Sequence, residues 1–154
     1  MFLQAIGLYL EEYLKNDPNY TPFMARRAAV FPSADARWQT ANNLEADLLL
    51  SIHMNSAVGE AGDGFECYPQ VPGETYHTKS LQFARFLATG ISDIQNLRGL
   101  DGVRFCYNNN GAHLFKESKD KNTEKLRSYY GVVRNAMCLA ALSELAFITT
   151  TPPM

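Results

Sequence analysis

Two continuous apolar blocks stand out from the pattern of hydrophobic and polar positions along the chain. The first covers residues 46–54 and runs into a small polar cluster that contains His53 and Asn55. The second covers residues 139–148 and carries Glu144 in its interior. Such runs are typical of strands buried on both faces of a sheet. The pattern therefore predicts two buried strands, although the second run also has the composition of a helix.

Three further segments show the spacing of apolar residues that is typical of an amphipathic helix. They cover residues 2–15, 34–44 and 78–95, and the first of them ends before a cluster of turn residues. Ser33 precedes the second helix and is a suitable N-cap, because its side chain can accept a hydrogen bond from a free backbone N–H. The first helix opens the sequence with no strand before it.

The remaining segments predict shorter elements. Residues 20–26 predict a short strand that Pro22 restricts to an edge, and residues 65–68 predict a strand after a glycine-rich loop. Residues 98–111 are irregular and polar, and residues 116–125 predict a solvated loop or an exposed helix. Because strands and helices alternate, we expect a single α/β domain with three layers, helix–sheet–helix, over residues 1–154.

Composition excludes several classes of function. The chain has 154 residues and a formal net charge of −2, which gives no electrostatic basis for binding nucleic acid or an anionic membrane. No apolar stretch reaches the ~20 residues of a membrane helix. Its three cysteines are odd in number and widely spaced, which argues against a disulfide framework. The first ten residues lack a basic leader, so no signal peptide is predicted.

His53 and Glu144 are the candidate chemical groups. His53 is either a hydrogen-bonded core residue or a group that binds a metal or transfers a proton. Glu144 either reaches solvent or an arginine such as Arg134, or lies in a desolvated cleft with a pKa tuned for proton transfer. Together they suit metal-assisted hydrolysis, although catalytic zinc normally keeps three protein ligands.

The stretch from Arg37 to Ser56 resembles the central motif of zinc-dependent N-acetylmuramoyl-L-alanine amidases of the amidase-3 type. Later segments are similar to later segments of that family in the same order: Gly64–Tyr68, Arg98–Leu100, Tyr130–Arg134 and Leu142–Ile148. The resemblance implies a phosphorylase/hydrolase-like fold, with a twisted mixed, mostly parallel sheet that lacks the family's first strand.

The resemblance also implies a substrate and a set of roles. Such enzymes cleave the amide bond between N-acetylmuramic acid and the first L-alanine of the peptidoglycan stem peptide. By resemblance, His53 is a Zn²⁺ ligand and Glu144 is the catalytic glutamate, while Asn55 and Arg134 are weaker candidates for binding substrate. The family's other two zinc ligands precede the helix that opens this sequence, so we expect a chain truncated at both ends, an incomplete zinc site and impaired activity.

Other interpretations remain open at this point. A non-catalytic peptidoglycan-binding module would keep the fold without the metal, and a zinc carboxypeptidase would use a related sheet. Peptidoglycan as the partner implies the cell wall, or an extracellular or periplasmic location. A sheet that lacks a strand exposes an unpaired edge, which predicts a marginally stable chain that forms homodimers or aggregates.

Overall fold

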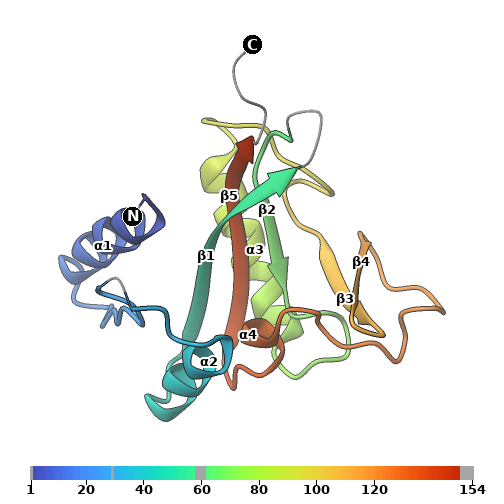
Figure 1. Ribbon diagram of the computed structural model, residues 1–154, viewed down its shortest axis with the longest axis horizontal. Coiled ribbons are helices and arrows are strands. Elements are labelled where there is room, and N and C mark those ends of the chain that lie inside the picture. Colours follow the sequence, from blue (N-terminus) through green and yellow to red (C-terminus); the bar gives the residue numbers. More distant parts are fainter. Residues whose placement is uncertain (1, 29, 58–61, 150–154) are drawn as a thin grey trace.

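The computed structural model describes residues 2–28, 30–57 and 62–149, and its centre is a three-stranded mixed sheet (Figure 1). Strand β5 (Leu139–Thr149) lies in the middle, between β1 (Leu48–Ala57) and β2 (Glu66–Pro69). β1 runs parallel to β5, and β2 runs antiparallel to it. The α/β class and the mixed sheet are confirmed, and within the described ranges no strand pairs with the outer edge of β1.

Four helices lie in the described part of the chain; the first three confirm the helical spacing read from the sequence, and the fourth, a single turn, was not predicted. Their bounds are α1 (Phe2–Lys15), α2 (Ala34–Asn43), α3 (His77–Ile91) and the short α4 (Gly131–Arg134). Ser33 caps α2 as predicted, since its Oγ accepts a hydrogen bond from the Ala36 N–H at 3.1 Å. Helix α3 ends four residues before the predicted bound, where the Ser92 hydroxyl donates to the Thr89 carbonyl and a turn follows.

Alternate residues of β5 face two different hydrophobic clusters. Ala140 and Leu142 pack with α4 and with Trp38 of α2, whereas Ala141 packs with Ala84 and Ala88 of α3. Helices therefore contact both faces of the central strand, while the number of layers stays a prediction. The period of two along β5 decides which residues can meet on each face.

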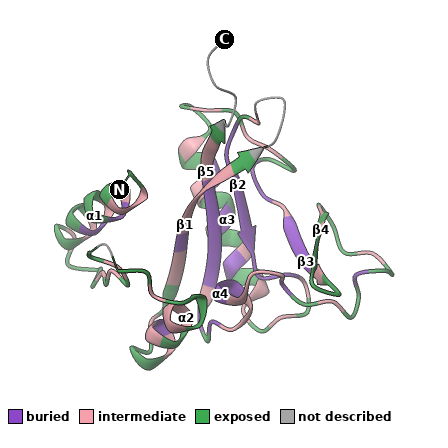
Figure 2. Cartoon of the chain, in the orientation of Figure 1, coloured by how far each residue is buried: buried purple, intermediate pink, exposed green. Residues whose placement is uncertain are grey.

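Burial differs between the two long strands (Figure 2). Residues 140–144 of β5 are all buried and pair with β1 and β2, which confirms the prediction of a buried strand rather than a helix. For β1 the prediction of burial on both faces is wrong: Leu48 is 41% exposed, and most of the following residues are only half-buried. The reason is its place at the edge of the sheet, where β5 is its one neighbouring strand among the described residues.

Two predicted segments have a different structure from the one expected. Residues 20–26 form no strand; the segment instead lies beside α1, where the Met24 side chain closely approaches Gly7. Residues 98–111 were interpreted as irregular, but residues 105–111 hold β3 (Phe105–Asn109) and the turn of its hairpin with β4 (Ala112–Lys116). Asn110 and Gly111 form this turn, both with positive φ, as a two-residue hairpin turn of type I′ requires. Residues 117–125 form turns and loop, the first of the two alternatives expected for residues 116–125.

The remaining expectations concern cysteines and the membrane. Cys67, Cys106 and Cys138 are free and buried, so each of them fills the core as a small apolar residue. No helix among the described residues has both the length and the apolar character needed to cross a bilayer.

Candidate active site

His53, Glu144 and Glu66 form one row across the three strands of the sheet. His53 of β1 is the register partner of Glu144 on β5, and Glu144 is in turn the partner of Glu66 on β2. Side chains of directly opposite residues point to the same face of a sheet. The two candidate residues named from the sequence are therefore neighbours, and a second carboxylate lies on the far side of Glu144.

Glu144 is a buried carboxyl group without a full set of partners. Its residue is 8% exposed, and its Oε2 is buried with no hydrogen-bond partner in the described part of the chain. Burial, and secondly the charge of Glu66, raise the pKa of Glu144 from its usual 4.5 to about 7. A carboxyl group of this kind can both hold and release a proton near neutral pH.

Glu66 has the opposite environment, although it is only 1% exposed. Its carboxylate accepts hydrogen bonds from the Tyr68 hydroxyl and from Arg98, and Arg104 Nη1 lies 3.3 Å from its Oε1. The two guanidinium groups compensate the buried negative charge. This residue was missed at the sequence level, although a glutamate between Phe65 and Cys67 is the same kind of anomaly as Glu144.

His53 is half-buried, and its Nε2 forms a hydrogen bond with Ser51 Oγ at 2.9 Å. Burial, and secondly the charge of Arg37, lower the pKa of His53. A neutral imidazole is the form that binds metals or accepts protons. Both functional interpretations of His53 are compatible with this environment, and so is the structural one.

The described residues do not fit a complete zinc site. They contain no group of three His, Cys, Asp or Glu side chains placed to hold a metal ion. His53 has a serine hydroxyl and the row of carboxyl groups beside it, whereas a catalytic zinc ion normally has three protein ligands and a water. No chemical step is therefore assigned to a metal.

The two weaker candidates lie in different places. Asn55 follows His53 on β1, beyond an irregularity in the register, and its Oδ1 accepts a hydrogen bond from the Ser56 N–H at 2.8 Å. Arg134 ends α4, and its Nη1 donates to the carbonyl oxygens of Ser128 and Tyr129 at 3.0 and 3.2 Å. Asn55 is therefore two residues from His53 of the row on the same strand. The Arg134 guanidinium, in contrast, is hydrogen-bonded to backbone carbonyl oxygens outside the row.

A comparison with models of known protein families identifies the family of this chain. The model of the N-acetylmuramoyl-L-alanine amidase family matches residues 1–152. The chain belongs to that amidase family. No curated protein sequence is similar enough to count as a match.

Solved amidase structures share the fold of this amidase-family chain at low identity. The catalytic domain of CwlV from Bacillus (Paenibacillus) polymyxa var. colistinus is 24% identical, with a TM-score of 0.63 over 94% of this chain and 64% of that one. An amidase from Clostridium difficile 630 is 22% identical, with a TM-score of 0.69 over 94% and 64% of the two chains. AmiC2 of Nostoc punctiforme is 19% identical, with a TM-score of 0.67 over 95% and 65%. The chain therefore spans less than two thirds of the length of these structures.

Proposed function

We propose that this chain is a peptidoglycan hydrolase that cleaves the amide bond between N-acetylmuramic acid and L-alanine of the stem peptide, with Glu144 as the proton-transfer residue. Membership of the amidase family supports the reaction class. The observation that carries the residue assignment is the buried Glu144 carboxyl group, whose Oε2 has no partner among the described residues.

Hydrolysis of an amide needs two proton transfers, one from the attacking water and one to the leaving amine. Water adds to the carbonyl carbon and loses a proton, and the C–N bond then breaks as the leaving amine gains one. A carboxyl group with a pKa of about 7 can accept the first proton and deliver it to the amine at neutral pH. Glu66 cannot take this role, because Tyr68 and two arginines already occupy its carboxylate.

We also propose that His53 is a Zn²⁺ ligand and that Asn55 and Arg134 bind substrate. The described residues do not complete a zinc site, so the metal role of His53 is tested separately from the role of Glu144. A peptidoglycan substrate places the protein at the cell wall, or in an extracellular or periplasmic location.

The direct test is hydrolysis of purified sacculi or of a muramoyl peptide, with mass spectrometry of the products and metal analysis of the protein. We expect released stem peptides, and a loss of about 10²–10⁴-fold for Glu144→Gln, the range typical of a removed acid–base group. Glu124→Gln, at an exposed position, is the matched control and keeps full activity. Absence of turnover by the wild type, with and without added zinc, would refute the proposal.

A non-catalytic peptidoglycan-binding module is the second candidate. It is favoured by one observation, that the described residues bring together no three metal-binding side chains. Retention on sacculi without any product would support this module and reject the hydrolase. Release of free amino acids instead of stem peptides would indicate a carboxypeptidase.

A further inference from the structure

An aromatic cluster connects the β3–β4 hairpin to the face of the sheet that carries the row. Each of its five members has its ring centroid within 6 Å of the ring centroid of at least one other member: Tyr68, His113, Phe115, Tyr129 and Tyr130. His113 and Phe115 lie two residues apart on β4, and their rings stack at 8° with centroids 5.5 Å apart. The ring of His113 also lies 3.7 Å from that of Tyr129.

Part of this cluster is open to solvent. Tyr68 is buried, whereas Phe115 is 39% exposed and His113 is classed as exposed. Tyr129 and Tyr130 are each half-buried. The His113–Phe115 pair therefore has an aromatic surface that solvent can reach, and it differs from a lone exposed ring because its two rings are stacked.

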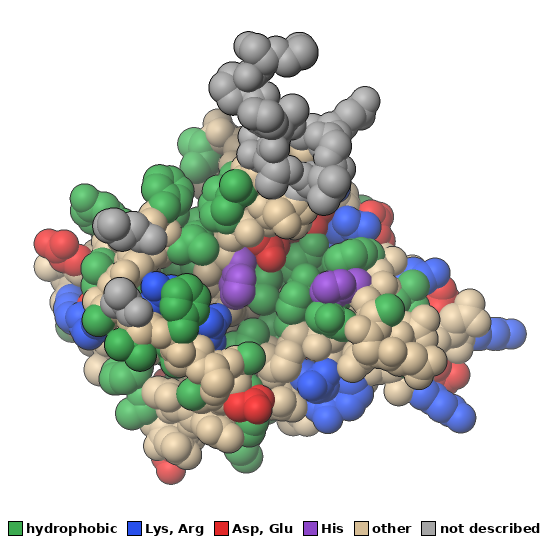
Figure 3. All heavy atoms as spheres, in the orientation of Figure 1, with side chains coloured by type: hydrophobic (Ala, Val, Ile, Leu, Met, Phe, Trp, Pro, Cys, Tyr) green, Lys and Arg blue, Asp and Glu red, His purple; other side chains and the backbone are tan. Residues whose placement is uncertain are grey.

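The exposed rings continue directly into the candidate active site. Tyr130 packs against Tyr68, and the charges of Glu144 and Glu66 are among the causes that raise its pKa, which places it near both carboxyl groups. The Arg104 guanidinium lies 5.0 Å from the Phe115 ring and 3.3 Å from the Glu66 carboxylate. Figure 3 shows one face of the molecule on which hydrophobic and acidic side chains lie between two histidines.

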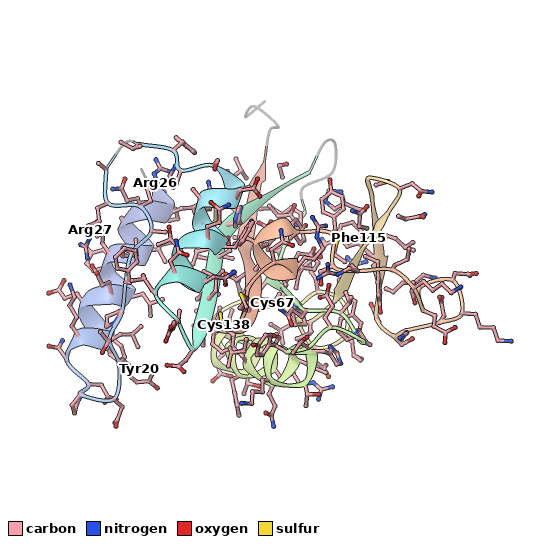
Figure 4. The ribbon with its side chains drawn as sticks, turned by 90° about the horizontal axis from the view of Figure 1, so that it is seen from below. Tyr20, Arg26, Arg27, Cys67, Phe115 and Cys138 are labelled. Atoms are coloured by element: carbon pink, nitrogen blue, oxygen red, sulfur yellow. The ribbon has the colours of Figure 1, made fainter. Side chains whose placement is uncertain are left out.

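Phe115 lies on the side of the β3–β4 hairpin, whereas Tyr20, Arg26 and Arg27 lie on the opposite side of the molecule, with Cys67 between them (Figure 4). The Tyr20 ring is therefore remote from that of Phe115.

We propose that His113, Phe115 and Tyr129 form a stacking surface for a pyranose ring of the glycan strand, next to the carboxyl row. A pyranose ring has a flat C–H face and hydroxyl groups at its rim, so it fits stacked rings edged by an imidazole and a phenol. This surface rests on the proposed hydrolase function, because only a sugar-containing substrate would require it beside Glu144. An extended peptide would instead find backbone partners at the outer edge of a strand.

The test uses the N-acetylglucosamine trimer, which has no muramoyl–peptide bond to cleave, so binding is measured independently of activity. We expect NMR titration to shift resonances of His113, Phe115 and Tyr129, whereas L-alanyl-D-isoglutamine leaves them unchanged. Phe115→Ala and Phe115→Leu should both weaken trimer binding about fivefold, within the energy of one aromatic contact. Phe86→Ala removes an aromatic ring that is 73% exposed on α3 and is the matched control, with wild-type affinity.

The outcomes of this titration either support or overturn the stacking surface. Wild-type affinity in Phe115→Leu would overturn the stacking surface, because leucine keeps the apolar volume and loses only the ring. Shifts induced by the sugar-free dipeptide, or no shift at the cluster with the trimer, would also overturn it. If the trimer binds at the cluster and the protein shows no turnover, the stacking surface is supported and the hydrolase function is refuted. If the protein shows turnover but does not bind the trimer, the hydrolase function is supported and the stacking surface is refuted. His113→Ala repeats the comparison at a second exposed position of the cluster if Phe115 variants fail to fold.

Discussion

Replacing Glu144 by glutamine should change how stability depends on pH. The pKa of Glu144 is raised from 4.5, its usual value and the one expected in the unfolded chain, to about 7 in the folded protein. The folded state therefore keeps the proton over this interval while the unfolded state loses it, so the stabilising contribution is complete below about pH 4.5 and is lost as pH rises through 7. At about 1.36 kcal/mol per pH unit, this amounts to about 3 kcal/mol.

The assay is urea unfolding of the wild type and Glu144→Gln at intervals from pH 4.5 to pH 8. Glutamine mimics the protonated carboxyl group and does not titrate, so the variant should gain about 3 kcal/mol relative to the wild type across this range. Glu124→Gln, at an exposed position, should show no comparable change. A difference between wild type and Glu144→Gln that stays constant with pH would refute the reasoning that burial and Glu66 keep this carboxyl group protonated.

Three further outcomes follow from the described contacts. Glu66→Gln should cost about 2–3 kcal/mol in chemical unfolding, because it leaves Arg98 and Arg104 without their buried partner, and an unchanged midpoint would contradict the ion-pair account. Ser33→Ala should cost about 1 kcal/mol in the same assay through loss of the α2 cap, whereas Ser33→Gly should cost only a few tenths. Sedimentation velocity over a hundredfold range of concentration should show self-association, since no described strand covers the outer edge of β1, and a monomer throughout would reject association through that edge.

The features that the sequence predicted well are those with a local signal. Helix α1 follows from apolar spacing, and α2 from its cap at Ser33. The β5 strand was the harder case, because its composition also suits a helix. Its short length and its continuation into Phe147, Ile148 and Thr149 favour the strand, and its pairing with β1 and β2 bears this out.

The failures came where tertiary contacts decide the outcome. The segment 20–26 has strand-like composition, but it packs along α1 instead of pairing with a strand. The burial of β1 could not be predicted, because a continuous apolar run does not say whether a strand has neighbours on both sides. The hairpin of β3 and β4 did have a local signal, since Asn110-Gly111 is a typical two-residue turn, and the polar residues around it hid this.

The environment of Glu144 shows most clearly why the site could be predicted only in part. A carboxylate inside an apolar run is visible in the sequence, and so is the second one at Glu66. Their meeting is set by the antiparallel register of β2 and β5, which places the two residues directly opposite each other. Like charges in that position repel, so both can be buried only if one is compensated and the other keeps its proton. The loop that precedes β3 carries Arg98 and Arg104 and places both beside Glu66 rather than Glu144. Because these arginines compensate the charge of Glu66, Glu144 is the carboxyl group that is available for proton transfer.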